Sequence, residues 1–586
     1  MNRRKNRRVQ WLIALLASAM MVFAFTFSAV AGSKDTFTWA SIGTVGTIDP
    51  AKAYDDASME TIWNVYETLI WYDGANSEKF IPVLATKVPT VENGGITDGG
   101  KTIIFNIRKG VKFHNGDILT PEDVEYSLER AMICDPDGGP MWMLLEALVG
   151  TGSTRGSDGK LKPGIVDKIK KAVEVEGDNV VIRMPAPYPP IMSIFVSSLC
   201  SIIDKKWAIK NGCWDGNYAH AAKFNGPESG KEPLAKIENG TGPYTIKEWV
   251  PSDRIVYERF DGYWGKKPPI KTGIRKYVPE WSTRMLMMQS GDLSVLRVPA
   301  SHLPEVQEMK NVRLVETPSL FVTTAFFCQH IETAGNPNIG SGKLDGNGIP
   351  PDFFSDINVR KAFQHCFDAK LYKKEVTNGK GEILTAPLPK GLPFQKDVKG
   401  YEFNLKKAAE YMKKAWGGKV WEKGFKMTIL YNTGNDMRQA AANMIAENVM
   451  KLNPKFKIEV SHVEWKDYWV RYRQHIYPIF IIGWFADFAD PHNFLYTFMS
   501  SNGAYGKHMM FRNEEIDRLC DAGIKESRVS ERKKIYEKLQ ELWVKYALGI
   551  NVIQPVTIRA YPNNVKTKPI NSLLASIVLI KDHEIK

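Results

Sequence analysis

The residues best suited to ligand chemistry stand late in the chain, where Asp487 follows Trp484 and Phe485. They come directly after residues 479–482, a short apolar run of the kind that forms a strand buried on both faces. Such strands belong to mostly parallel sheets, which bind ligands just beyond the carboxyl ends of their strands. The pattern therefore predicts that Asp487 meets a ligand, with Asp490 as a second nearby carboxylate.

The segments around this run predict the unit that positions Asp487. Strand patterns at 427–431, 456–460 and 479–482 alternate with amphipathic helix patterns at 437–449 and 465–474. A β-α-β-α-β order with short connections is typical of a parallel α/β unit. We therefore expect the aspartate at the end of a sheet strand.

Length and composition predict a globular chain of more than one domain. The 586 residues are 44% hydrophobic and 24% charged, which argues against a long disordered chain. The tail from 552 to 580 returns to strand-like runs and is expected to rejoin the first half. Lysines and arginines are scattered among 65 acidic residues and form no stripe with aromatics, so we expect no nucleic-acid partner.

The first 31 residues predict export. Five basic residues precede an uncharged, mostly apolar run at 11–30, and Ala29-Val30-Ala31 is a small-x-small cleavage site. We expect a signal peptide over residues 1–31 that is cleaved. The alternative is an uncleaved anchor, because the apolar run is almost long enough to span a bilayer. Without these five cations the formal net charge falls from +13 to +8, which is typical of a mildly basic exported protein.

The six cysteines and the histidines indicate neither a metal nor a cofactor. No C-x-x-C occurs, so a zinc knuckle and a thioredoxin motif are not expected. No histidine pair reaches the ligand count of a zinc site, and Asp487 and Asp490 lack the further oxygens of a calcium site. Cys200 and Cys213 could close a short loop as a disulfide or could be small buried hydrophobic residues. The spacing leaves both interpretations open.

Several sequence blocks, each weak alone, occur in a specific order along nearly the whole chain after the signal. They are residues 47–50 (TIDP), 67–70, 81–85, 98–130, 240–244 (GTGPY), 263–265 (YWG), 356–363 and 483–487 (GWFAD). Together they resemble the extracytoplasmic solute-binding proteins of ABC transporters, family 5, the class that binds dipeptides, oligopeptides or nickel.

The resemblance implies an α/β fold of two lobes with a ligand cleft between them, the large three-subdomain form of the class II periplasmic-binding-protein-like fold. Lobe I is expected at 32–320 with an inserted subdomain, and lobe II at 321–550. Residues 551–586 are expected to return to lobe I. The two chain crossings, near 318–325 and 548–555, are expected to form a hinge.

The resemblance also implies a role for the GWFAD block. The aspartate of this block in peptide binders pairs with the ligand's N-terminal ammonium, because a cation enclosed between two lobes needs a full counter-charge. The resemblance implies that Asp487 takes that role here, with Gly483, Trp484 and Phe485 as pocket wall and backbone contacts. The alternative is that Asp487 only caps the following turn. Trp465 matches a pocket tryptophan of the oligopeptide binders, and core packing is its alternative.

Two further places correspond to ligand contacts in the family. Gly43, Thr44 and Val45 lie where the first loop offers backbone groups to the ligand main chain. Arg438 lies near the position of a carboxylate-binding side chain, a role that suits the bidentate fork of arginine. Arg473 is the competing candidate, and either arginine could instead be a solvated surface residue.

The resemblance implies a non-catalytic, monomeric periplasmic protein that captures di- and oligopeptides by hinge closure. It would deliver them to an inner-membrane ABC permease. Within the family the alternative ligands are a metal chelate, haem, an opine or an oligosaccharide, and sixteen tryptophans leave room for a stacked sugar. A secreted hydrolase is not expected, because no G-x-S-x-G, H-E-x-x-H or Cys/His nucleophile signature occurs.

Overall fold

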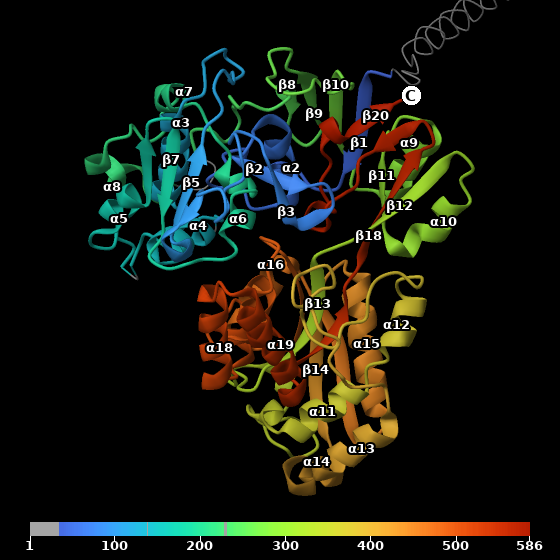
Figure 1. Ribbon diagram of the computed structural model, residues 1–586. Coiled ribbons are helices and arrows are strands. Elements are labelled where there is room, and N and C mark those ends of the chain that lie inside the picture. The colour runs from blue at the N-terminus through green and yellow to red at the C-terminus, as the bar shows by residue number, and fades with distance from the viewer. Residues whose placement is uncertain (1–33, 137–138, 157, 228–230) are drawn as a thin grey trace, which may run out of the picture.

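The computed structural model describes residues 34–586 except 137–138, 157 and 228–230. Figure 1 shows two lobes, one above the other, with their junction at the start of β18 and the start of β13. Strands β1–β12 and β18–β20 belong to lobe I, and β13–β17 belong to lobe II. The predicted two-lobed α/β architecture is confirmed, whereas the predicted signal peptide at 1–31 lies outside the described residues.

Lobe I is built around a sheet of order β1-β10-β9-β8, in which β1 and β10 are parallel and the other neighbours antiparallel. Phe37 and Trp39 occupy alternate positions of β1, so both reach the same buried face. The strands of this sheet are β1 (Thr36–Ser41), β8 (Tyr244–Val250), β9 (Arg254–Arg259) and β10 (Thr272–Tyr277). Helix α2 (Asp56–Val65) packs beside β8; Asp55 is its N-cap, and Tyr54 directly precedes that cap.

Three smaller sheets complete the strands of lobe I outside the inserted subdomain. The C-terminal strand β18 lies between β11 and β12 and is antiparallel to both. The bounds are β2 (Ile70–Asp73), β3 (Asn76–Pro82), β11 (Leu296–Val298), β12 (Val312–Pro318), β18 (Val556–Pro562), β19 (Val565–Thr567) and β20 (His583–Ile585), with helices α9 (Trp281–Gln289) and α10 (Leu303–Gln307). The tail therefore rejoins the first half of the chain.

The inserted subdomain is an antiparallel sheet of order β4-β5-β7-β6 with helices around it. Its longest helix begins with Thr120 and Asp123 in a capping box and Pro121 in the first turn. The bounds are β4 (Ile96–Thr97), β5 (Thr102–Asn106), β6 (Val173–Glu176), β7 (Asn179–Arg183), α3 (Pro121–Cys134), α4 (Trp142–Val149), α5 (Ile165–Ala172), α6 (Ile191–Ile194), α7 (Lys205–Lys210) and α8 (Ala221–Phe224).

Lobe II is a five-stranded sheet of order β15-β14-β16-β13-β17. Strand β14 is parallel to β15 and β16, as the sequence pattern predicts, and β13 is antiparallel to β16 and β17. The strands are β13 (Phe321–Phe327), β14 (Phe425–Asn432), β15 (Phe456–Val463), β16 (Ile479–Phe485) and β17 (Gly549–Ile553). The first four residues of β16 are all buried, which explains their apolar character.

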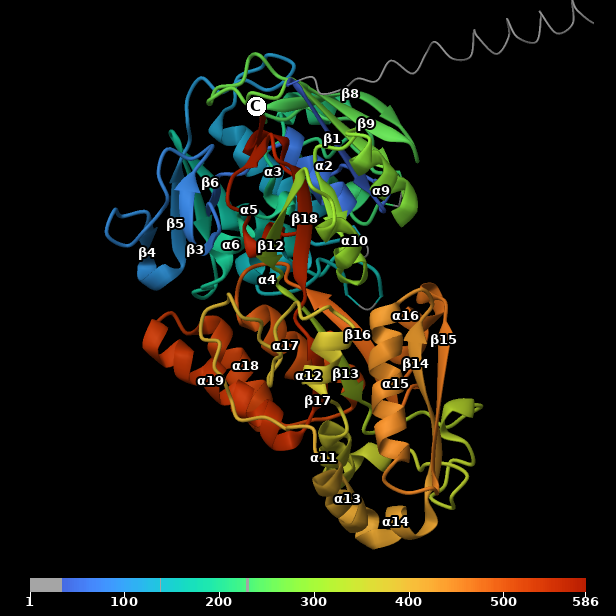
Figure 2. The same ribbon diagram turned by 90° about the vertical axis from the view of Figure 1, so that its right-hand side faces the viewer.

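Helices pack around this sheet (Figure 2). They are α11 (Ile357–His365), α12 (Ala369–Glu375), α13 (Leu405–Lys414), α14 (Lys419–Lys423), α15 (Asp436–Met450), α16 (Trp465–Arg473), α17 (His492–Met499), α18 (Glu514–Lys525) and α19 (Val529–Tyr546). None of the helices among the described residues is both long enough and apolar enough to cross a bilayer.

The chain crosses between the lobes twice, and the two crossings lie side by side. Strands β12 and β13 are separated by residues 319–320, and β17 and β18 by residues 554–555. Ser319 donates its backbone N–H to Pro555 O at 3.3 Å, and the Gln554 amide donates to Ser319 O at 3.0 Å. The expected boundary at residue 550 falls inside β17, so the return to lobe I comes after Ile553.

The six cysteines are free buried thiols. The disulfide interpretation of Cys200 and Cys213 is therefore wrong for this structure, and the buried-hydrophobe interpretation describes them. Burial raises the pKa of both thiols, which keeps them protonated at neutral pH.

Asp490 is a buried structural partner of Arg532 in α19. The Arg532 guanidinium donates to Asp490 through two bonds of 2.7 and 2.8 Å, and Asp490 also accepts the N–H of His492 at 2.8 Å. Both side chains are about 7% exposed. This pair fixes the turn after β16 against α19, and Asp490 is not available as a second ligand carboxylate.

We expect Arg532→Met to lower the free energy of unfolding by about 3–5 kcal/mol, because Asp490 is left as a buried charge without a partner. The double variant Asp490→Asn/Arg532→Met should recover part of that loss. Urea unfolding followed by tryptophan fluorescence measures both. Equal losses in the single and double variants would contradict the assignment of the cost to an unpaired charge.

Candidate functional site

Asp487 lies two residues beyond the end of β16, where lobe II faces lobe I. Its Oδ1 accepts the Tyr54 hydroxyl of lobe I at 2.7 Å, and its Oδ2 accepts the Asn493 amide of lobe II at 3.2 Å. The carboxylate therefore lies between the lobes and bonds to both. The predicted position at the end of a sheet strand agrees with this geometry.

Tyr54 joins Asp487 to the inserted subdomain. Trp142 at the start of α4 donates its indole N–H to the Tyr54 hydroxyl at 3.2 Å. The same indole lies 6.4 Å from the ring of Phe488, the residue after the aspartate. A chain of donors thus runs from Trp142 through Tyr54 to Asp487 across the cleft.

Asn493 holds the site together from the lobe II side. Its side-chain oxygen accepts the Trp484 indole N–H at 2.8 Å and the backbone N–H of Asp487 at 3.1 Å. Its amide nitrogen donates to the Asp487 carboxylate. Asn493 is 2% exposed at the start of α17, so its orientation is fixed by packing. Trp484 and Asp487 are therefore positioned by one buried amide.

The Asp487 carboxylate has only neutral donors. Burial raises its pKa to about 6, and the hydrogen bonds from Tyr54 and Asn493 oppose that rise. No described lysine or arginine forms an ion pair with it. At neutral pH the site therefore presents a negative charge without a counter-charge, and a bound cation would lower the free energy of the site.

A small cavity of about 130 Å³ adjoins the carboxylate. Its apolar wall includes Met59, Trp63 and Phe485, while Asp55 and Asp56 at the start of α2 add acidic groups. The lining set contains no lysine or arginine. The chemistry of this corner therefore suits a positively charged group on an apolar stem. No group of three or more metal-ligating side chains occurs in the described part of the chain.

Gly483 and Trp484 shape the wall beside the carboxylate. A Cβ at Gly483 would lie 2.1 Å from the ring of Phe321, so a larger residue here would displace that ring. The Gly483 carbonyl accepts the Tyr505 hydroxyl at 2.8 Å, and the Tyr505 ring meets Trp484 edge-on at 5.4 Å. The Gly483 carbonyl is thus engaged within lobe II.

Arg438 is buried rather than solvated. It lies in the first turn of α15, is 8% exposed, and donates to the Asn432 side chain at 2.7 Å. Burial lowers its pKa, and Tyr468 and Tyr505 lie close enough to oppose that effect. Because Tyr505 also meets Trp484, Arg438 stands behind the wall of the site. The competing Arg473 is exposed and lies over the Trp469 ring, which fits a surface arginine.

No hydrogen bond or ion pair among the described residues joins the loop 43–45 to Asp487. The Gly43 carbonyl accepts the Arg275 guanidinium at 2.8 Å, Thr44 is exposed, and Val45 packs on the core of lobe I. The role of Gly43, Thr44 and Val45 in ligand binding stays a prediction. Trp465 begins α16, but its side chain lies outside the described part of the chain, so its pocket role also stays a prediction.

Sequence reasoning missed Tyr54, Trp142, Asn493 and Tyr505. Asn493 carries a weak signal, because an amide six residues after Asp487 stands where a helix follows the strand-end turn. No sequence signal identifies Tyr54 or Trp142, because each lies in another lobe or subdomain and reaches the Asp487 site only through the tertiary fold.

The comparisons with known proteins agree with this architecture. Residues 79–506 match the family model of the bacterial extracellular solute-binding proteins, family 5. The chain is 24% identical to the oligopeptide-binding protein AppA of Bacillus subtilis, covering 95% of this chain and 94% of that protein. It is 26% identical to the dipeptide-binding protein of Escherichia coli, with 83% and 82% covered.

One relative is named for a different ligand. The chain is 24% identical to heme-binding protein A of Haemophilus influenzae, covering 92% of this chain and 90% of that protein. Among solved structures, the periplasmic binding protein DppA of Helicobacter pylori in complex with the peptide STSA matches with a TM-score of 0.70 and 21% identity. That match covers 94% of this chain and 98% of the other. The family model spans most of the sequence, and this chain belongs to the bacterial extracellular solute-binding proteins of family 5.

Proposed function

We propose that this protein captures peptides with a free amino terminus and that Asp487 binds their ammonium group. The observation that carries the proposal is the carboxylate between the lobes, which is held by neutral donors and lacks a counter-charge. An ammonium group supplies three donors and one positive charge, which match these needs. Relatives named for dipeptides and oligopeptides support the same ligand class.

Hinge closure is the proposed mechanism. Asp487 comes from lobe II and Tyr54 from lobe I, so a ligand held at the carboxylate contacts both lobes at once. Such a ligand binds the closed arrangement better than the open one, and this difference in affinity favours closure. The capture involves no covalent step, and the site needs no catalytic group.

The cellular role follows from the same proposal. The chain would be exported by a cleavable signal peptide over residues 1–31, act as a monomer in the periplasm, and deliver peptides to an inner-membrane ABC permease. A haem, opine, metal chelate or oligosaccharide ligand is the alternative within the family. A neutral sugar leaves Asp487 without a counter-charge, so the site favours an amine.

Asp487→Asn should weaken a free-amine peptide by about tenfold to a hundredfold, because a charge-assisted hydrogen bond contributes about 1.5–3 kcal/mol. The N-acetylated form of the same peptide has no ammonium and should lose far less. Calorimetry with both ligands on both proteins measures the difference. Equal losses for the two ligands would remove the amine role of Asp487.

Peptide affinity should rise about tenfold between pH 5 and pH 7, because the Asp487 carboxyl, with a pKa of about 6, must be ionised to bind an ammonium. At pH 6 about half of the sites carry a proton, so binding should release about half a proton per ligand. Calorimetry in buffers of different ionisation enthalpy measures that release. Asp487→Asn is the control and should show neither effect; a wild-type affinity that does not change with pH contradicts the assignment.

Tyr54→Phe should move the midpoint of this pH dependence upward. The Tyr54 hydroxyl bond lowers the pKa of Asp487, so its loss leaves the carboxyl harder to ionise. Trp142→Phe is the matched control, since it removes the donor to Tyr54 but leaves the hydroxyl on the carboxylate. An unchanged or lower midpoint in Tyr54→Phe would show that the phenol does not stabilise the charged form.

A further inference from the structure

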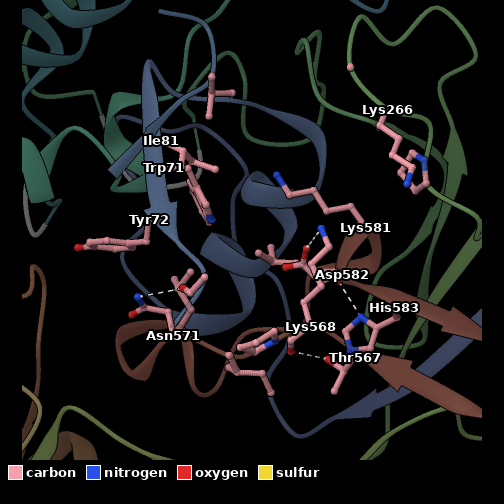
Figure 3. Close-up of a pocket in the computed structure, with 18 of the residues that line it drawn as sticks. Trp71, Tyr72, Ile81, Lys266, Thr567, Lys568, Asn571, Lys581, Asp582 and His583 are labelled. Atoms are coloured by element: carbon pink, nitrogen blue, oxygen red, sulfur yellow. Dashed lines mark hydrogen bonds and ion pairs between the residues drawn. The ribbon is translucent and has the colours of Figure 1, made fainter. Parts of the chain in front are cut away.

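A second and larger cavity lies within lobe I (Figure 3). Its volume is about 910 Å³, and its lining residues come from the segments 67–83, 263–269 and 566–584. Small-molecule sites commonly span about 300–1,000 Å³, so the space is sufficient for a ligand. All three segments belong to lobe I, so the shape of this cavity does not depend on closure of the two lobes.

The walls of the cavity are aromatic and aliphatic. Trp71 and Ile81 extend from the β2–β3 hairpin on one side in Figure 3, while Trp264 and prolines of the 263–269 segment contribute to the lining. Trp71 and Trp264 are both partly exposed, so their faces have apolar area left to bury. An occupant with an apolar or aromatic body would remove that area from water.

Hydrogen bonds to Glu67 fix the aromatic loop at 263–264. The Glu67 carboxylate accepts the Tyr263 hydroxyl and the Trp264 indole N–H, each at 2.7 Å, and the Thr241 hydroxyl at 3.1 Å. Glu67 is 5% exposed, and burial raises its pKa. The acid at the base of the cavity is therefore occupied by protein donors, and it fixes the wall in place before any ligand arrives.

The charged groups around the cavity are mostly lysines. Five lysines from two chain segments line it: Lys266, Lys267, Lys566, Lys568 and Lys581. Three of them have an acidic neighbour: Lys568 lies 2.9 Å from Asp582, Lys267 lies 3.4 Å from Asp261, and Lys566 faces Glu584 across the β19–β20 ladder.

Lys266 and Lys581 differ from the other three. Neither forms an ion pair with an acid in the described part of the chain. The Lys581 ammonium lies 5.2 Å from the centre of the Trp71 ring, and Figure 3 shows this side chain reaching toward Trp71. Its field also acts on Glu67, which is already bonded to three neutral donors. Two lysines without an acidic ion-pair partner in the described part of the chain therefore line a cavity with apolar walls.

We propose that this cavity is a second binding site for an organic anion. It is distinct from the cavity at Asp487, although Ile577 lines both. The ligand class is an apolar or aromatic body that carries a carboxylate or a phosphate ester. The body would lie against Trp71 and Trp264, and the acidic group would bind Lys266 and Lys581. This amphiphilic pattern matches the division of the lining into aromatic walls and lysine ammonium groups.

Equilibrium dialysis of the full chain with three probes tests the proposal. Indole-3-acetate supplies a carboxylate, phenyl phosphate supplies a phosphate ester, and indole-3-acetamide is the neutral counterpart of the first. We expect at least one acid to bind saturably below about 10 mM and about fivefold more tightly than the amide. Weak binding of all three, or equal binding of acids and amide, overturns the proposal.

Charge-removing variants locate the site. Lys266→Gln/Lys581→Gln should weaken the bound acid about fivefold, while Lys206→Gln/Lys210→Gln, two exposed lysines on α7, should leave it unchanged. An equal loss of acid affinity in both double variants would indicate non-specific electrostatic attraction and contradict the proposed site. Asp487→Asn should not alter acid binding, and the Lys266/Lys581 pair should not alter peptide binding. The two proposals therefore fail independently.

Discussion

A carboxylate held between two lobes by neutral donors is the interaction on which the binding cleft depends. Asp487 bonds to Tyr54 of lobe I and to Asn493 of lobe II, and neither partner brings a positive charge. Hydrogen bonds to an ionised group stabilise it, but they do not replace the hydration that burial removes. The negative charge of Asp487 therefore lacks a counter-charge among the described residues of the cleft, and a cationic ligand can supply it. Packing holds the carboxylate in this position, through Trp484, Tyr505 and the buried start of α17.

The contrast between Asp487 and Asp490 explains how one short segment serves both structure and binding. Asp490 has a full counter-charge in Arg532, so it anchors the turn to α19 and offers nothing to a ligand. Asp487 stands three residues earlier, faces lobe I, and has no such partner among the described residues. The difference lies in what the surrounding elements supply, since the two residues are chemically identical.

The local part of this arrangement could be predicted from the sequence, and the long-range part could not. The buried run at 479–482 and the aspartate beyond it are adjacent in the chain, so periodicity and strand-end position identify them. Tyr54 is 433 residues away from Asp487, and no spacing rule connects them. Arg438 is similar: its sequence context allowed a surface position, and only the packing of α15 against β14 and Tyr505 shows that it is buried.

The two side-by-side crossings have a consequence for the energetics of capture. Each link between the lobes is two residues long, and Gln554 ties one link to the other. Short links of this kind hold the two half-sites at a high effective concentration, so their encounter is an intramolecular event with little loop entropy to lose. The main free-energy costs that ligand binding must offset are therefore desolvation of the cleft and alignment of its donors. The entropy cost of bringing the two lobes together is small.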